Sequence, residues 1–203
     1  VVEPTKAEIK SFLQSGFQVS KFKQAYGFKT LRTQDPAEVM RRIWAAPTFE
    51  VHGLVGGYHG PGVKTVVPGH GELKVSMRLV PNQTPEKAFA LLKKHVAKLN
   101  PEVTVEREGM LHPFRGVFDG PYVDAVKRAV KAGFGKEPAF IREGGSIGAV
   151  VTMQKAWKVP ILFMGLSLPE HGYHAPNEYF DWGQASGGMK AFVHYFAELA
   201  AKR

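Results

Sequence analysis

Apolar residues recur every three or four positions in six stretches of the chain, which predicts six amphipathic helices. One of them is expected to start at Asp35-Pro36-Ala37-Glu38, where Asp suits the cap, Pro the first turn and Glu the third position. Thr84-Pro85-Glu86-Lys87 marks another start in the same way. The segment at residues 18–34 has no such pattern and is expected to be irregular. We expect helices over residues 4–15, 35–46, 84–99 and 122–133, and two more that end at Trp157 and at Ala200.

A second pattern, strict alternation of apolar and polar residues, predicts strands in the middle of the chain. Residues 73–79 place four apolar side chains on one face and three polar ones on the other, and residues 49–55 and 103–107 alternate in a similar way. A glycine-rich loop follows the first of these strands. Further along, the continuous apolar run 159–164 predicts a buried strand, and a short strand is expected near Phe140.

The order of these elements indicates the fold class. Strand, strand, helix and strand within about 60 residues predict an α+β layer, an antiparallel sheet with helices on one face. A stretch rich in Gly, His and Pro at residues 109–121 is typical of a domain boundary. We therefore expect one domain over residues 1–112 and a second over 113–203, in which alternating strands and helices predict an α/β layer.

Composition narrows the possible chemistry. The 203 residues are 44% hydrophobic and 22% charged, as in ordinary globular proteins, and the chain has no cysteine. Disulfides and thiolate ligands are thereby excluded, so any metal must be held by imidazole and carboxylate. The net charge of +9 comes from scattered lysines and arginines without a nucleic-acid motif. No apolar run approaches the roughly 20 residues that a membrane helix needs, and no signal peptide is visible, so we expect no nucleic-acid or membrane partner and a cytoplasmic location.

His174 is the first candidate for chemistry. It lies in Gly172-Tyr173-His174-Ala175-Pro176-Asn177-Glu178, a segment rich in turn formers that follows the predicted strand at 159–164. A neutral imidazole is a common zinc ligand, and Asn177 or Glu178 could orient the ring. The alternative is an ordinary surface or packing histidine. His171 and Tyr173 are weaker candidates of the same loop.

A second candidate segment is Arg142-Glu143-Gly144-Gly145-Ser146-Ile147, which precedes the helix that ends at Trp157. Free backbone N–H groups at a helix start, together with the Ser146 hydroxyl and the Gly145 backbone, suit a carboxylate or an oxyanion. For Ser146 the alternative role is a simple helix cap. For Arg142 the alternative to anion binding is a surface ion pair.

A third segment carries Thr65 and Arg78. From the residues alone, Arg78 is a polar-face residue of a strand, and its forked guanidinium suits a carboxylate or amide oxygen. Taken together, the three segments resemble the lid and the C-terminal active-site loops of the di-zinc aminoacylase, glutamate carboxypeptidase and carnosine dipeptidase family of metallopeptidases. The separations of 13 residues from Thr65 to Arg78 and 28 from Ser146 to His174 are similar to those of the dipeptidase branch.

The resemblance implies roles for the candidate residues. His174 would bind one of two zinc ions, with manganese or cobalt as alternatives, and Gly145, Ser146 and Arg142 would hold a substrate carboxylate. Thr65 and Arg78 would reach the active site of a second copy, so a homodimer through the lid is expected. Gly148 stands where the family usually has Pro, which leaves the substrate preference open.

The resemblance also implies what this sequence lacks. In the family, the other metal ligands and the general-base Glu precede the lid, and none of those motifs is found here. The expected fold is therefore a lid followed by an incomplete α/β zinc-peptidase domain. The expected function is that of a fragment of a metal-dependent amidohydrolase, cleaving a peptide or acyl-amino-acid amide bond in the parent enzyme and inactive as this chain alone. A non-catalytic dimerisation or binding module is the alternative.

Overall fold

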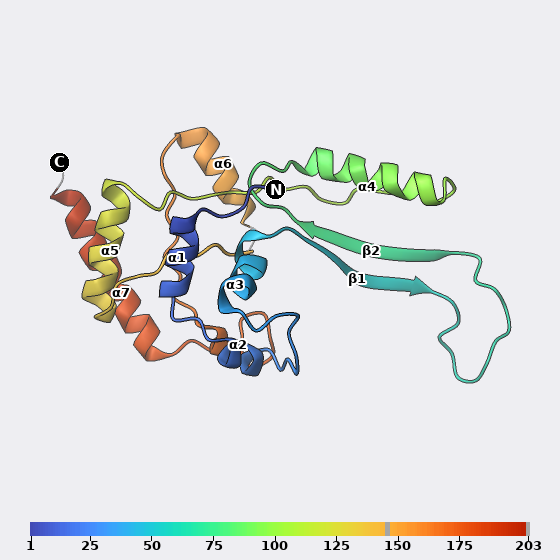
Figure 1. Cartoon of the computed structure of the whole chain (residues 1–203), viewed down its shortest axis with the longest axis horizontal. Helices are drawn as coiled ribbons and strands as arrows, with labels where there is room; N and C mark the ends of the chain where they lie inside the picture. The colour runs from blue at the N-terminus through green and yellow to red at the C-terminus, as the bar shows by residue number, and fades with distance from the viewer. Residues whose placement is uncertain (145–146, 202–203) are drawn as a thin grey trace. The chain divides into compact units, whose positions relative to one another are not determined.

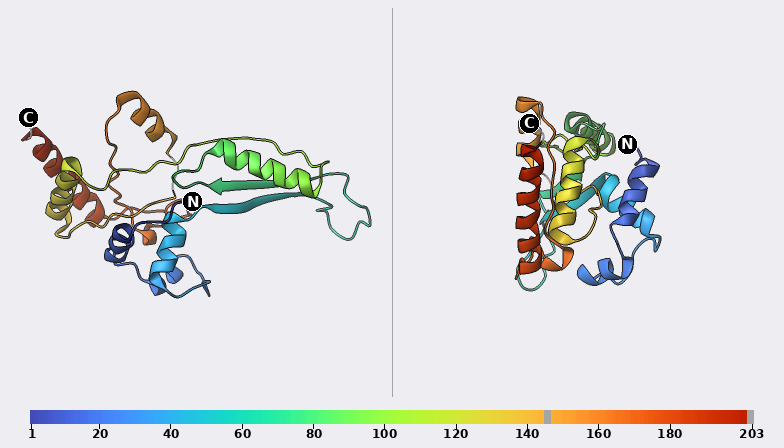
Figure 2. Two further views of the ribbon diagram at one scale, coloured as in Figure 1. Left: turned by 45° about the horizontal axis from the view of Figure 1, so that its top comes forward. Right: turned by 90° about the vertical axis from the view of Figure 1, so that its left-hand side faces the viewer.

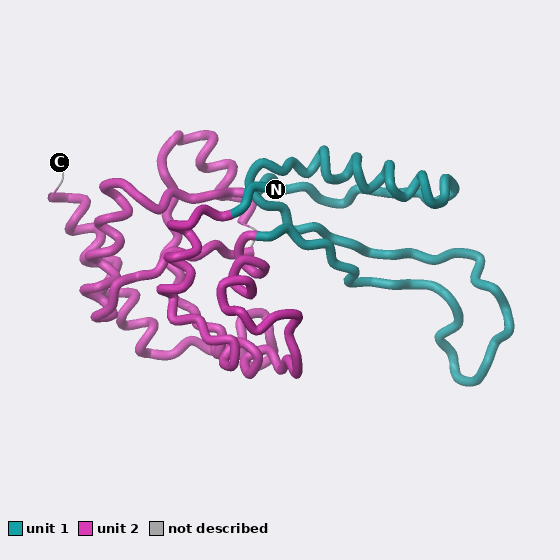
Figure 3. The backbone as a smooth tube through the Cα atoms, in the orientation of Figure 1, with its two compact units in different colours: residues 1–3, 46–113 teal, residues 4–45, 114–203 magenta. Residues whose placement is uncertain are grey.

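The computed structural model describes residues 1–144 and 147–201, which form two compact units (Figure 3). Unit 1 consists of residues 1–3 and 46–113, and unit 2 of residues 4–45 and 114–203. The two domains predicted from the sequence also meet near residue 113, but the prediction placed residues 4–45 in the first domain, whereas they belong to unit 2. Backbone and side-chain bonds explain the difference, because the Ser11 hydroxyl donates to the Phe140 carbonyl (2.8 Å) and accepts from the Phe140 N–H (3.0 Å).

Unit 1 is built on a long antiparallel hairpin. Its strands are β1 (Thr48–Gly56) and β2 (Gly71–Arg78), which pair from Thr48 opposite Arg78 to Gly56 opposite Gly71. The register shifts between Val51 and Gly53, which marks a bulge. Helix α4 (Pro85–Leu99) runs alongside the hairpin (Figures 1 and 2). This arrangement confirms the predicted α+β class.

Helix α4 begins where the sequence indicated. The Thr84 hydroxyl accepts a hydrogen bond from the Lys87 N–H (3.3 Å), and Pro85 occupies the first turn, where its missing N–H is not needed. After α4 the chain runs back past the helix (Figure 1). The predicted third strand at residues 103–107 is wrong, because this segment forms no ladder of hydrogen bonds with β1 or β2.

Unit 2 contains the remaining helices. The predicted helices are confirmed, with bounds within a few residues of those expected. An additional short helix, α2, lies in the segment expected to be irregular; its cap residue, Gln18, makes no side-chain cap bond, so the start carried no sequence signal. The elements are α1 (Lys6–Gln14), α2 (Val19–Ala25), α3 (Pro36–Ala45), α5 (Pro121–Phe134), α6 (Gly148–Trp157), the 3₁₀ helix η1 (Pro169–His171) and α7 (Trp182–Ala200).

Two packing regions stabilise unit 2. In the first, Phe12 of α1 and Met40 of α3 are fully buried, and Trp44 packs its ring edge-on against Phe12. In the second, α5 and α7 lie side by side and antiparallel (Figures 1 and 2). These two helices approach so closely that a Cβ at Gly133 would collide with the carbonyl oxygen of Gly187. The pair α5–α7 therefore forms a firm support for the loop that precedes α7.

The strands predicted at residues 159–164 and near Phe140 are not formed in the described part of unit 2. Neither segment has regular secondary structure, and neither has a ladder partner among the residues described. Alternating or apolar patterns favour extended backbone, whereas a strand also needs a second strand to accept its hydrogen bonds. The apolar run 159–164 is accordingly only partly covered, and Phe163 is more than half exposed.

Candidate functional site

His174 lies in the loop between η1 and α7, and its side chain is exposed. Its backbone has a φ of +64°, in the left-handed region that non-glycine residues rarely adopt. Asn177 has a similar φ of +63°. Two turns shape the loop, since the Ala175 N–H donates to the Gly172 carbonyl (2.9 Å) and the Glu178 N–H to the Ala175 carbonyl (3.2 Å). The backbone N–H of His174 donates to the Glu178 carboxylate (3.3 Å), so Glu178 supports the turn at the histidine itself.

The base of this loop is closed by a buried histidine. His171 is 1% exposed, and its Nε2 lies 2.7 Å from Oδ2 of Asp181, the residue that caps α7. The carbonyl of His171 also accepts from the N–H of Tyr179 (3.1 Å). The ring packs against the rings of Tyr179 and Phe180. The loop that carries His174 is thus tied at both ends, by a side-chain bond and by a backbone bond.

The remaining contacts of His171 define its tautomer. Its Nδ1 accepts from the Leu168 N–H (3.1 Å), so Nδ1 carries a lone pair and Nε2 carries the proton donated to Asp181. The Ser167 hydroxyl lies 3.3 Å from the same Nδ1. Ser167, His171 and Asp181 have the composition of a hydrolytic triad, but the single lone pair of Nδ1 is already bonded to an amide. The imidazole is therefore poorly suited to act as the base of a serine nucleophile.

Asp181 connects this pair to α7. Its Oδ1 accepts from the Gln184 N–H (2.9 Å), and its Oδ2 accepts from His171. The backbone bond from Gln184 and the bond from His171 lower the pKa of Asp181 below its usual value. A carboxylate that stays ionised suits both tasks, because each bond is donated to a negative acceptor.

A second contact supports the loop from α2. The hydroxyl groups of Tyr173 and Tyr26 lie 3.1 Å apart, and α2 packs against η1. The rings of Phe22 and Phe28 pack against Tyr26. The hydrogen bond to Tyr26 and burial raise the pKa of Tyr173, and the negative charge of nearby Glu143 raises it further.

Arg142 is held by a buried carboxylate. Its Nη2 lies 2.5 Å and its Nε 3.2 Å from Oε1 of Glu8, and Arg115 donates to the same oxygen (3.1 Å). The side chain of Glu8 is 8% exposed and that of Arg142 is 18% exposed. Burial by itself would raise the pKa of Glu8, but bonds from the Thr5 N–H, Arg142 and the Thr5 hydroxyl lower it below the usual value.

Glu8 therefore has two functions in unit 2. It completes a capping box with Thr5 at the start of α1, and it neutralises part of the charge of Arg142 and Arg115. Because two guanidinium groups share one carboxylate, the cluster retains net positive charge beside the segment that leads to α6. The spacing Thr5-x-x-Glu8 was a visible capping-box signal, whereas the ion pair to a residue 134 positions away had no local signal.

The other predicted residues are distributed over both units. Gly145 and Ser146 lie outside the described residues. Thr65 is exposed in the loop between β1 and β2, and Arg78 is exposed at the opposite end of β2 (Figure 1). Within unit 1, Thr65 and Arg78 are thus separated by the eight-residue length of β2, about 25 Å at the rise of an extended strand. One hairpin does not bring these two side chains to a single point.

Among the described residues, potential metal ligands occur as isolated side chains and not as a group. No group of three or more His, Asp or Glu residues within 1–144 and 147–201 is arranged to hold a metal ion. His174 supplies one exposed imidazole with the appropriate donor chemistry.

Within residues 1–144 and 147–201, no helix has the length and apolar character needed to cross a membrane.

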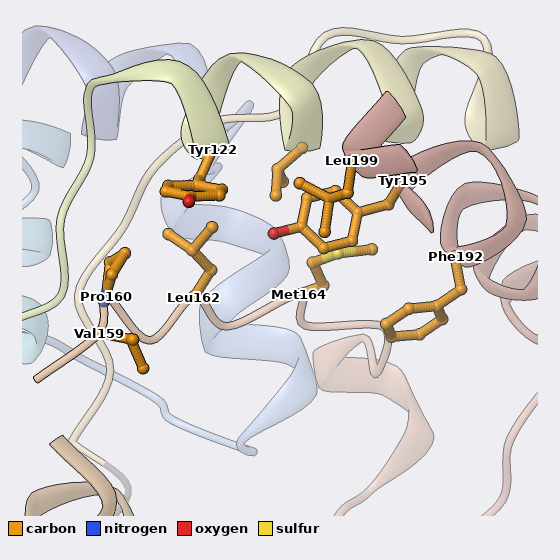
Figure 4. Close-up of a pocket in the computed structure, with 9 residues that line it drawn as sticks. Tyr122, Val159, Pro160, Leu162, Met164, Phe192, Tyr195 and Leu199 are labelled. Atoms are coloured by element: carbon orange, nitrogen blue, oxygen red, sulfur yellow. The ribbon is translucent and has the colours of Figure 1, made fainter. Parts of the chain in front are cut away.

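A pocket of about 360 Å³ lies elsewhere in unit 2 (Figure 4). Helices α5 and α7 and the segment 159–164 line it, and none of the predicted site residues does. Burial raises the pKa of Tyr195 in its wall. Its lining consists of Tyr122, Val126, Val159, Pro160, Leu162, Met164, Phe192, Tyr195 and Leu199.

The chain is similar to known proteins in both sequence and fold. Residues 8–104 match the peptidase dimerisation domain of the M20 peptidases. The Cys-Gly metallodipeptidase of Schizosaccharomyces pombe is 30% identical over 207 residues, which covers 99% of this chain and 44% of that protein. The crystal structure of human carnosine dipeptidase 1 has a TM-score of 0.84 at 26% identity, over 99% of this chain and 44% of that one. An M20 family metallo-carboxypeptidase from Sulfolobus solfataricus gives 0.85 at 29% identity, over 96% and 45%.

The chain is therefore a homologue of the M20 metallopeptidases, and the resemblance predicted from the sequence is confirmed. It spans less than half the length of the relatives it matches. Two of these three relatives are metallopeptidases by name, which implies a metal cofactor and hydrolase activity for the group. The match over residues 8–104 includes α1 and α3 of unit 2 as well as the hairpin of unit 1.

Proposed function

We propose that this chain supplies the dimerisation domain and the C-terminal active-site loops of a metal-dependent dipeptidase. The observation that carries the proposal is the similarity of 99% of the chain to dipeptidases in both sequence and fold. The remaining ligands and the general base would come from residues that precede the lid and that this sequence does not contain. By itself the 203-residue chain is expected to be inactive.

His174 is the proposed metal ligand. Its ring is exposed, its backbone is fixed by Glu178 and by two turns, and an imidazole suits zinc. It would serve as one donor among several to such an ion. Bound zinc would supply Lewis acidity for amide hydrolysis, and manganese or cobalt are alternatives.

The proposed substrate-binding residues are distributed over both units. In unit 2, Gly145 and Ser146 would hold a substrate carboxylate, and Arg142 would contribute the excess positive charge it shares with Arg115 and Glu8. In unit 1, Thr65 and Arg78 would act on the site of a second copy. The separation of these two residues along β2 means that they would touch different parts of that site. Dipeptides or acyl-amino acids are the proposed substrates.

The proposed assembly is a homodimer through the lid. Its support is the match to a peptidase dimerisation domain and the exposure of both strands of the hairpin. The same observation favours a second candidate function, a non-catalytic module that only self-associates. Sedimentation analysis of the 203-residue chain would test the dimer, and a monomer at high concentration would contradict it.

The decisive experiment compares the chain alone with the full-length protein, meaning the product of the complete reading frame that encodes these residues. Zinc content and hydrolysis of Cys-Gly and β-Ala-His would be measured for both. We expect uptake and cleavage only in the full-length protein, and loss of tight zinc binding in His174→Ala. His194→Ala, which removes an exposed histidine of α7, is the matched control. A full-length protein that binds no metal would defeat the enzyme proposal and favour the module.

A further inference from the structure

We propose that His171 is a positioning residue for the metal ligand: through Asp181 it holds the His174 loop in its binding conformation. The inference rests on the proposed role of His174. It assigns to His171, a weaker ligand candidate in the sequence, a function in which it does not touch the metal. Three observations carry it, namely the burial of His171, the bonds of both ring nitrogens and the closure of the loop.

Burial separates the two histidines of the loop. His171 is 1% exposed, between Tyr179 and Phe180, whereas His174 three residues later is exposed. Both nitrogens of His171 are bonded within unit 2, to Leu168 and Asp181. A ring with both nitrogens in use cannot coordinate a metal without breaking one of these bonds. Its contribution must therefore be made through the backbone that it fixes.

The two bonds of His171 close the loop at its base. The side chain reaches Asp181, ten positions along the chain, while its carbonyl accepts from Tyr179. Between these anchors the backbone takes the left-handed conformation at Gly172, His174 and Asn177. Such conformations cost free energy for non-glycine residues and persist only where the surroundings over-determine them. Without the closure, the loop would sample other turns and present the His174 ring in many directions.

Asp181 connects the loop to a rigid element. The same carboxylate caps α7 through the Gln184 N–H, and α7 packs against α5 at Gly133 and Gly187. Through Asp181, His171 is thereby anchored to the packed helix pair α5–α7. Groups that orient metal ligands typically change metal affinity by 10- to 100-fold when they are removed.

The test uses His171→Gln and Asp181→Asn in the full-length protein. Asn is a good helix cap, so Asp181→Asn keeps an oxygen that accepts from the Gln184 N–H, while an amide NH2, which cannot accept a hydrogen bond, takes the place of Oδ2 opposite His171. His194→Gln makes the same change as His171→Gln at an exposed site of α7. Zinc affinity would be measured by chelator competition, and the ligand field by the absorption spectrum of the Co²⁺-substituted protein. Circular dichroism would select a temperature at which every variant is folded.

We expect His171→Gln and Asp181→Asn to weaken zinc binding by about 10- to 100-fold and to alter the Co²⁺ spectrum, with His194→Gln unchanged. A merely structural histidine would lower the unfolding temperature and leave the affinity and the spectrum of the folded protein intact, which would overturn the inference. If His174→Ala itself leaves zinc affinity unchanged, the proposed function has failed. If His174→Ala weakens binding and the other two variants do not, only the present inference has failed.

A second measurement needs only the 203-residue chain and no metal. Nitrogen chemical shifts of the His171 ring should show a protonated Nε2 and an unprotonated Nδ1. In Asp181→Asn, hydrogen exchange at the Tyr179 and His174 amides should accelerate, whereas it should stay unchanged in His194→Gln. The opposite tautomer in the wild-type chain, or unchanged exchange in Asp181→Asn, would contradict the closure. This arm remains decisive if His171→Gln does not fold.

Discussion

Two glycine- and proline-containing loops of this molecule differ in how far they support themselves. The loop between β1 and β2 carries Thr65 and has few internal bonds, such as the Val66 N–H to the Lys64 carbonyl (2.9 Å) and the Tyr58 hydroxyl to the Pro61 carbonyl (2.9 Å). The loop before α7 carries His174 and is tied by two turns, a buried histidine and a tyrosine pair.

The comparison indicates two kinds of candidate site. Unit 2 fixes its candidate residues by its own contacts, since His171 closes the His174 loop and Glu8 holds Arg142. Unit 1 presents Thr65 on an exposed loop whose conformation a partner could complete. If this interpretation is right, removing the contacts that hold the candidate residues of unit 2 should lower the stability of the isolated chain. Changes in the unit 1 loop should leave that stability almost unchanged and alter only the activity of the proposed assembly.

The largest effect is expected from Glu8→Gln. The substitution leaves Arg142 and Arg115 without their shared carboxylate at a buried site and weakens the capping box of α1. Removing one partner of a buried pair costs about 3 kcal/mol of unfolding free energy, as urea denaturation of the 203-residue chain would measure. Glu38→Gln, which affects two ion pairs on the more exposed surface of α3, is the control and should cost much less. Equal losses in the two variants would show that Glu8 has no special supporting role.

A related prediction concerns acid. Because the pKa of Glu8 is lowered on folding, its ionised form stabilises the folded state fully above its unfolded pKa of about 4.5. That contribution is lost as the pH falls through the lower, folded pKa. Urea midpoints measured in acid and at neutral pH should therefore show the wild-type chain approaching Glu8→Gln in stability as the solution is acidified. A difference that stays constant with pH would mean that charge is not the origin of the effect.

A smaller effect is expected for Tyr26→Phe, which removes the bond to Tyr173. The loss should be about 1 kcal/mol, the usual net value of one hydrogen bond, and the pKa of Tyr173 should fall towards its ordinary value. Calorimetry and ultraviolet titration of tyrosinate would measure the two changes. Tyr58→Phe removes a similarly exposed hydroxyl bond in the hairpin loop and should have less effect, because that bond joins positions only three residues apart whereas the Tyr26 bond joins two distant segments. If the hairpin variant is the more destabilised, the contrast between the loops is wrong.

The smallest effect on stability is expected for Thr65→Ala. The residue is exposed and lies in an open loop, so the unfolding free energy of the chain should change by less than about 0.5 kcal/mol. In the full-length protein, however, the proposed role in a partner's site predicts a clear loss of dipeptide hydrolysis. Thr104→Ala, at another exposed threonine of unit 1, should change neither quantity. Normal turnover by the Thr65 variant would remove this residue from the proposed site.

The helices could be predicted from sequence because their signals are local. Thr84, Pro85 and the spacing of apolar residues define α4 within a few positions, and Asp35-Pro36 does the same for α3. The strands at residues 103–107 and 159–164 could not be predicted in this way, since alternation fixes the tendency to be extended but not the presence of a pairing strand. Among the strands expected in the described residues, those of the hairpin β1 and β2, whose partners are close in sequence, are the ones that formed.

The candidate site shows the same difference between local signals and contacts that join distant positions. Its candidate residues were proposed from segments with characteristic residue types and spacing, and the resemblance to M20 peptidases was inferred from the same segments. The contacts that hold these residues were missed, because they join distant positions: Glu8 with Arg142, and Tyr26 with Tyr173. His171 and Asp181 were nearer, and a signal was available, since an Asp before the apolar pattern of α7 is a typical cap.

The left-handed backbone of His174 implies a conflict at this position. Glycine would adopt the φ of +64° without steric penalty, so His174→Gly should relieve about 1 kcal/mol of strain relative to any side chain. The same change would remove the imidazole. Relief of backbone strain alone would therefore favour glycine at position 174, and the proposed role of the ring as a metal ligand opposes that change.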